Sequence, residues 1–146
     1  MRILGIDYGE KRVGLAISSP VGFIAQGLPT IERIDGMDYL EELADVINEK
    51  EVDEIVVGLP KNMNGSIGEK AEVVLVLVET LKSKFNLPVH TFDERLTTVR
   101  ANRAMAGAKM SKKGKKKRVD MIAAQFILQA YLDQKSRSAE QDWEDV

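Results

Sequence analysis

The chain has 146 residues, 44% hydrophobic and 30% charged, which is typical of one globular domain and not of a disordered segment. It contains no cysteine and one histidine, His90. This composition excludes disulfide frameworks, thiolate metal centres, cysteine nucleophiles and sites that need two imidazole groups. No apolar run reaches the length of a membrane span, and Asp7 follows Met1 too soon for a signal peptide. We therefore expect a cytoplasmic protein without membrane partners.

The net charge of −2 conceals an uneven distribution of charge. Ten of the 21 Lys and Arg residues lie between Arg95 and Arg118, where there is no Asp or Glu, so the other eleven share the rest of the chain with all 23 acidic residues. Residues 109–118 alone carry seven cations. Because these cations repel one another unless a polyanion neutralises them, the run predicts a mobile loop that binds nucleic-acid phosphates. A solvated loop without a partner is the alternative.

The first part of the chain predicts three strands followed by a helix and another strand. Strands are expected at residues 2–7, 13–18, 24–31 and 54–58, and a helix at 37–47. The tight turn after Asp7 makes the first two strands a hairpin. Gly27 and Pro29 place the third strand at an edge of the sheet, because proline cannot donate to a central ladder.

The second part alternates helices and strands. Helices are expected at residues 66–85, 98–106 and 119–130, and a strand at 88–92. The run at 73–78 has the composition of a strand, but Ser66 and Glu69 form a capping box before it and its length favours a helix. Residues 135–146 are polar, so we expect one domain over 1–134 and a flexible C-terminal tail.

This order of elements predicts an α/β fold with a mixed five-stranded sheet flanked by helices. The leading strands form a three-stranded antiparallel meander, and the two later strands, each reached through a helix, run parallel. Functional sites in such sheets collect at the carboxyl ends of the parallel strands.

Acidic residues occur where this fold places sites. Asp7 ends the first strand, Asp93 and Glu94 end the last, and Asp120 opens the final helix. Each of these acidic residues, taken alone, could simply form a turn or cap a helix. Together, beside a basic region, they predict carboxylate ligands for Mg²⁺ or Mn²⁺, ions that can activate water for phosphodiester cleavage. The spacing does not choose between Asp93 and Glu94, although neighbouring strand residues face opposite ways.

Four segments resemble the motifs of the YqgF/RuvX family. They are DYGEKRVGLA at 7–16, GLPKNMNGS at 58–66, DERLTT at 93–98 and VDMIAA at 119–124. They occur in the family's order and span nearly the whole chain. Asn64 and Ser66 stand where Asp and Thr are common in the family, and neither change removes a carboxylate of the expected site.

The resemblance implies an RNase H-like fold related to Holliday-junction resolvases. It also implies a bacterial nuclease of ribosome biogenesis that matures the 5′ end of precursor 16S rRNA. By the motif match, Asp7, Glu94 and Asp120 are the catalytic carboxylates and the ligands of Mg²⁺ or Mn²⁺. We expect a monomer or weak homodimer that binds structured RNA, or branched DNA.

The expected substrate-binding residues are cations near the carboxylates and polar residues of the motifs. They are Lys11, Arg12, Asn62, Arg95, Thr97, Lys112, Lys113, Lys115, Lys116, Lys117 and Arg118. Turn chemistry and simple solvation are the alternative roles. Two other functions stay open. A resolvase of four-way DNA needs paired active sites and hence a dimer, and a non-catalytic rRNA-binding module would bind without cleaving.

Overall fold

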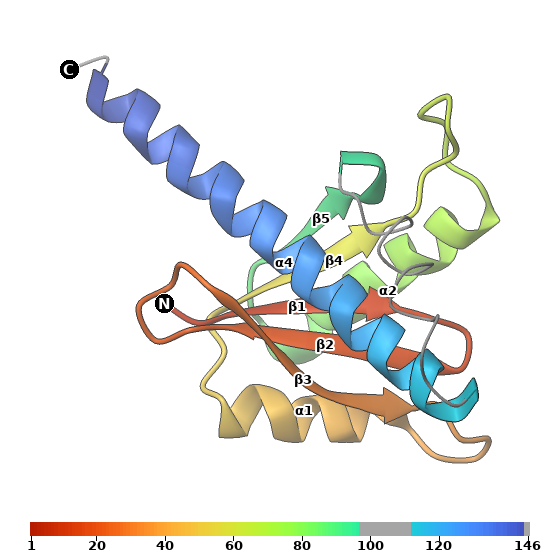
Figure 1. Cartoon of the computed structure of the whole chain (residues 1–146). Helices are drawn as coiled ribbons and strands as arrows, with labels where there is room; N and C mark the ends of the chain where they lie inside the picture. Colours follow the sequence, from red (N-terminus) through yellow and green to blue (C-terminus); the bar gives the residue numbers. More distant parts are fainter. Residues whose placement is uncertain (97–111, 145–146) are drawn as a thin grey trace.

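The computed structural model describes the backbone of residues 1–96 and 112–144 and the side chains of residues 1–95 and 120–138 (Figure 1). The expected helix at 98–106, and Thr97, lie outside the described residues. The elements are β1 (Ile3–Tyr8), β2 (Arg12–Ser18), β3 (Ala25–Glu32), α1 (Tyr39–Glu49), β4 (Glu54–Leu59), α2 (Glu69–Phe85), β5 (Val89–Asp93), a short 3-10 helix (Glu94–Leu96) and α4 (Lys112–Glu144).

The five strands form one mixed sheet in the order β3-β2-β1-β4-β5. Strands β1, β2 and β3 are antiparallel neighbours, whereas β4 and β5 run parallel to β1. This confirms the predicted meander, the two parallel strands and the edge position of β3. The β2–β3 register shifts between Val13 and Leu15, so the edge strand that contains Pro29 pairs irregularly with its neighbour.

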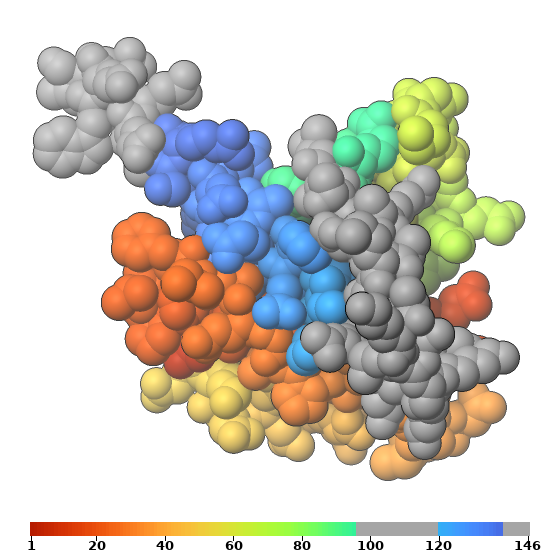
Figure 2. Space-filling view, viewed as in Figure 1, coloured from red at the N-terminus to blue at the C-terminus, as the bar shows by residue number. Residues whose placement is uncertain are grey.

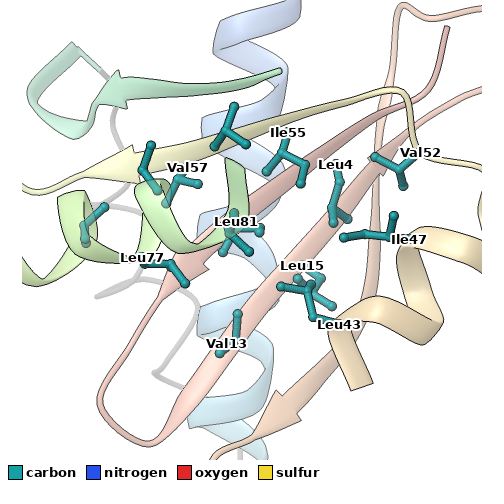
Figure 3. Close-up of a cluster of buried hydrophobic side chains, with 14 of the residues drawn as sticks. Leu4, Val13, Leu15, Leu43, Ile47, Val52, Ile55, Val57, Leu77 and Leu81 are labelled. Carbon is teal, nitrogen blue, oxygen red and sulfur yellow. The ribbon is translucent and has the colours of Figure 1, made fainter. Parts of the chain in front are cut away.

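Helices cover both faces of the sheet. Helices α1 and α2 pack on one face, and α4 crosses the other (Figure 1). Alternation along β1 sends Leu4 and Ile6 into the larger core under α1 and α2, and Ile3 into the smaller core under α4. Figure 3 shows the larger core, where Leu43 and Ile47 of α1 and Leu77 and Leu81 of α2 meet the strands.

Small residues bring α4 close to the sheet. Ala123 and Ala124 are fully buried on the helix. On the sheet, a Cβ built on Gly5 would lie 2.8 Å from the Cβ of Leu128, and one on Gly14 would overlap the backbone of Asp120. The body of α4 therefore lies against the strands, and its last turns extend past the edge of the sheet (Figure 1). In Figure 2 the middle turns of α4, in blue, lie beside the orange surface of the β2–β3 region.

Helix α2 begins differently from the prediction. The expected capping box of Ser66 and Glu69 is wrong, because the N-cap is Gly68 and it makes no side-chain cap hydrogen bond. Ser66 is engaged in a turn instead: its backbone N–H and its hydroxyl both donate to Asn64 Oδ1, at 3.0 and 2.6 Å, and its hydroxyl accepts from Asn62 Nδ2 at 2.9 Å. The helix starts after that turn.

Helix α4 is longer at both ends than predicted. It begins at Lys112, so the backbone of 112–118 is helical and the prediction of a loop over these residues is wrong. Lysine and arginine are good helix formers, so the repulsion among the cations does not prevent the helix. Residues 135–144 continue α4, and Lys135 is tied to Glu54 by an ion pair of 2.8 Å. A domain boundary at 134 and flexibility beyond it stay predictions.

None of the helices in the described ranges is long and apolar enough to cross a membrane.

The close packing of α4 gives a prediction of stability. Replacing Gly14 with Ala places a methyl group against the Asp120 backbone, which cannot rotate away. We expect Gly14→Ala to lower the free energy of unfolding by about 1–3 kcal/mol, as overpacking does, and the melting temperature by about 2–4 °C for each kcal/mol. Thermal melts check this, with Val76→Ala as the control: Val76 is 67% exposed on α2, and its loss should change stability by less than about 0.5 kcal/mol. Equal stability of Gly14→Ala and wild type would contradict the packing argument.

Candidate active site

A cleft of about 860 Å³ opens at the carboxyl ends of the strands and beside the start of α2. Its lining includes Asp7 from β1, Glu94 after β5 and Asp120 from α4. The opposite wall comes from Gly68, Glu69 and Lys70 at the start of α2, with Val73 and Val74 in the turn that follows. The topology therefore brings three acidic residues that are far apart in the sequence to one cavity.

Two glycines beside Asp7 make this gathering possible. Asp7 is 6% exposed and lies on the α4 face of β1, where its register partner on β2 is Gly14. The Asp120 backbone covers Gly14 directly. On the other side of β1, Val57 pairs with Ile6, so Gly58 follows beside Asp7. A Cβ on Gly58 would lie 2.8 Å from Glu94 Oε1, so Glu94 extends over this glycine.

The structure distinguishes Glu94 from Asp93. Phe92 packs in the core under α4, so the alternation along β5 turns Asp93 away from that face. The Asp93 carboxylate pairs with Arg95 at 2.7 Å and does not line the cleft. Glu94 begins the 3-10 helix and does line it.

Arg95 is engaged within the chain. Its Nε donates to both oxygens of Asp93 at 3.1 Å, its Nη2 to one of them at 2.7 Å, and its Nη1 to the Met63 carbonyl at 3.3 Å. Gly65, which has a φ of +87°, lies under the same guanidinium. Arg95, predicted as a phosphate ligand, thus ties the end of β5 to the turn that carries Asn62.

Other predicted binding residues are distributed unevenly. Asn62 lines the cleft, whereas exposed Lys11 and half-buried Arg12 do not. The backbone of 112–118 forms the first turns of α4, directly before Asp120. Three cleft cations were not among the predicted residues: Arg33, Lys61 and Lys70. Lys61 lies two residues beyond β4, and this position just after a strand end could have identified it as a cleft residue from the sequence.

A sequence model of the RuvX family, described as a Holliday junction resolvase, matches residues 1–134. The chain belongs to the RuvX family. A Clostridium acetobutylicum protein named "Putative pre-16S rRNA nuclease" is 53% identical over 133 residues, covering 91% of this chain and 98% of that protein. A protein of the same name from Clostridium botulinum is 50% identical over 137 residues, covering 94% and 100%. The resemblance predicted from the motifs is confirmed.

Solved structures show the same fold as this RuvX chain. Thermus thermophilus RuvC in complex with a Holliday junction substrate aligns with a TM-score of 0.54 at 15% identity, covering 93% of this chain and 96% of that one. The fowlpox virus Holliday junction resolvase aligns with a TM-score of 0.54 at 15% identity, covering 92% and 99%. The predicted RNase H-like fold is therefore confirmed. Membership of the RuvX family makes the chain a nuclease and implies, in general, dependence on a divalent metal.

The cleft of the RuvX chain offers the donors that such a metal prefers. Carboxylate oxygens are hard ligands suited to Mg²⁺ and Mn²⁺, and the cleft presents Asp7, Glu94 and Asp120. Within the described residues, no three His, Cys, Asp or Glu side chains are close enough to hold one ion. The donor set fits a divalent cation in chemistry, and binding one by all three acids requires them to draw closer.

The Arg95–Asp93 pair gives a pH prediction. The hydrogen bonds from Arg95 lower the pKa of Asp93, and the same pairing raises the pKa of Arg95. A lowered carboxyl pKa stabilises the fold above the unfolded value, near pH 4, and this contribution is lost as the pH falls through the folded pKa. In Arg95→Gln, we expect NMR titration to show the pKa of Asp93 moving up towards its ordinary value. An unchanged titration would mean that the pair does not form in solution.

Proposed function

We propose that this chain is a metal-dependent nuclease that processes the 5′ end of precursor 16S rRNA in the cytoplasm. The observation that carries the proposal is the gathering of Asp7, Glu94 and Asp120 in one cleft at the strand ends. The names of the clostridial relatives support the RNA substrate. We further propose that the protein acts as a monomer or weak homodimer.

In this proposal the three carboxylates are both the catalytic residues and the ligands of Mg²⁺ or Mn²⁺. Asp7 is fixed by the central strand, Glu94 by the turn after β5, and Asp120 by the packing of α4 on Gly14. A bound divalent ion supplies an activated water and stabilises the leaving oxygen.

The cations and polar groups around the carboxylates orient the substrate. Lys61, in the loop after β4, and Lys70, at the start of α2, both line the cleft, and Asn62 follows Lys61 on the turn that Arg95 holds. We place the phosphodiester backbone between this wall and the carboxylates. In this proposal the cations of residues 112–118, which precede Asp120 in the sequence, bind further phosphates of a structured RNA.

The description of the family favours a second candidate, the resolution of four-way DNA junctions. A cleavage assay with Mg²⁺ and with Mn²⁺ separates the candidates by comparing precursor 16S rRNA, a single-stranded RNA and a synthetic four-way junction. Cleavage at the rRNA 5′ end supports our proposal, and cleavage confined to the junction supports the resolvase. Binding without cleavage in either metal would instead make the chain an rRNA-binding module.

Isosteric substitutions test the carboxylates. Asp7→Asn, Glu94→Gln and Asp120→Asn each remove a charge that the metal needs, and a loss of several kcal/mol of transition-state stabilisation lowers the rate by about 100-fold or more. We expect each variant to lose cleavage and to retain nucleic-acid binding in a gel-shift assay. Asp93→Asn is the control, because this neighbouring acid lies outside the cleft, and it should cleave within about tenfold of wild type. Cleavage by Asp7→Asn at the wild-type rate would exclude the proposed site.

Salt dependence tests the basic start of α4. Each phosphate neutralised contributes about −0.7 to −0.9 to the slope of log affinity against log salt. If Lys112, Lys113, Lys115 and Lys116 contact phosphates, changing all four to Gln should flatten this slope by about 3. The matched control is the double change of Lys82 and Lys84 to Gln near the end of α2, where the slope should stay unchanged. If the fourfold variant and wild type show the same salt dependence, these lysines are solvated and do not contact phosphates.

A further inference from the structure

Arg33 follows β3 and lies on the wall of the cleft in a defined position. Its guanidinium carbon is 4.7 Å from the ring centre of Tyr8 and 5.3 Å from that of Tyr39. Its Nη1 donates to the Gly9 carbonyl at 2.9 Å, in the turn after β1. The backbone N–H of Arg33 donates to the Lys11 carbonyl at 2.9 Å, which anchors the residue to the start of β2.

The two tyrosines that hold Arg33 are themselves fixed. Their rings are 5.7 Å apart, and the Tyr39 hydroxyl lies 3.4 Å from the Tyr8 hydroxyl. Both rings pack against the larger core, so they are part of the folded body and not of a free loop. A planar cation held on aromatic faces loses little further entropy when its edge binds a ligand.

The position of Arg33 leaves part of the guanidinium available. Among the described residues, its Nε and Nη2 have no hydrogen-bond partner and the side chain forms no ion pair, although Asp7, Glu10 and Glu69 line the same cleft. A half-buried guanidinium with an open edge in a cleft is suited to an oxyanion, because its parallel N–H groups match two phosphate oxygens.

The strand geometry distinguishes this position from the carboxylate site. Asp7 faces α4, whereas the next residue, Tyr8, packs on the opposite side with α1 and α2. Arg33, stacked on Tyr8, therefore approaches the cleft from the other side of the end of β1. A phosphate that it binds is a different phosphate from the one that faces the three carboxylates.

We infer that Arg33 is a substrate-binding residue that holds a backbone phosphate next to the scissile one, and that Tyr8 and Tyr39 are the residues that position it. The inference rests on the proposed function, because it takes a nucleic-acid strand as the occupant of the cleft. Arg33 contributes to substrate affinity and to the position of the strand in the cleft, and the scissile phosphate still binds beside the carboxylates.

The first test measures binding of a precursor 16S rRNA 5′ fragment in chelator, where no cleavage occurs. Arg33→Gln should weaken binding about tenfold and flatten the salt slope by about 0.7–0.9, the share of one phosphate. Arg33→Lys keeps the charge but not the planar fork, so it should restore the slope and only part of the affinity. Arg137→Gln, an exposed cation near the end of α4, is the control. Wild-type affinity and slope in Arg33→Gln would overturn the inference.

A second test neutralises single phosphates of the substrate and compares wild type with Arg33→Gln. RNA fragments that each carry one uncharged methylphosphonate should reveal a non-scissile position that weakens wild-type binding. Arg33→Gln should be insensitive at that position, and equal sensitivity of both proteins at every position would refute the contact. The cleavage assay is interpreted separately. If wild type does not cleave the RNA but its binding depends on Arg33, only the nuclease proposal is wrong. If wild type cleaves the RNA and the Arg33 variants bind it equally well, only this inference is wrong. A wild-type protein that binds no nucleic acid defeats both.

Discussion

The close contact between α4 and the sheet determines where the site can form. A helix normally packs about 10 Å from a sheet, a distance set by the side chains between them. Here the strands present Gly5 and Gly14 and the helix presents Ala123 and Ala124, so backbone meets backbone. Aspartate has a short side chain, and it reaches the strand ends from α4 only at such a distance. The same lack of side chains around Asp7 leaves room for the carboxylates themselves.

The contact is fixed again at the other end of the sheet, where the parallel strands begin. Glu54 at the start of β4 is 8% exposed, and a buried carboxylate is costly unless it is paired. Lys135 of α4 binds one of its oxygens at 2.8 Å, and His90 lies 3.2 Å from the other. Burial, followed by the nearby charge of Glu54, raises the pKa of Tyr131 to about 12, so this neighbour stays a neutral hydrogen-bonding group. Helix α4 is thus held by packing near the cleft and by an ion pair at the opposite end of the strands.

Periodicity predicted most of the fold, because buried strands and amphipathic helices impose their patterns on the sequence. The strands were placed within one or two residues, and β3 was correctly placed at an edge from Pro29. The errors came from specific polar contacts, local and long-range, that hydrophobic periodicity does not encode. Ser66 looked like a helix cap, but two asparagines of its own turn engage its hydroxyl. The extension of α4 beyond residue 134 includes Lys135, whose ion pair with Glu54 joins residues 81 positions apart.

Part of the candidate site could also be predicted from the sequence, because its residues lie near the ends of elements that the periodicity identified. The predicted strand ends placed Asp7 and Glu94 at the cleft, whereas Asp120, expected at the start of the last helix, lies inside α4, which begins at Lys112. The family motifs selected Glu94 over Asp93, and the alternation along β5 agrees with Glu94 as the residue that lines the cleft. Arg33 carried no such signal, since it follows an edge strand and belongs to none of the four motifs. Its position depends on Tyr8 from β1 and Tyr39 from α1, two rings that come together only in the folded protein. A cleft that binds a polyanion needs cations that stay available to phosphates beside acidic residues. In this chain Arg95 has its own partner, Asp93, outside the cleft, whereas Arg33 is held on aromatic faces, which attract a cation but carry no net charge.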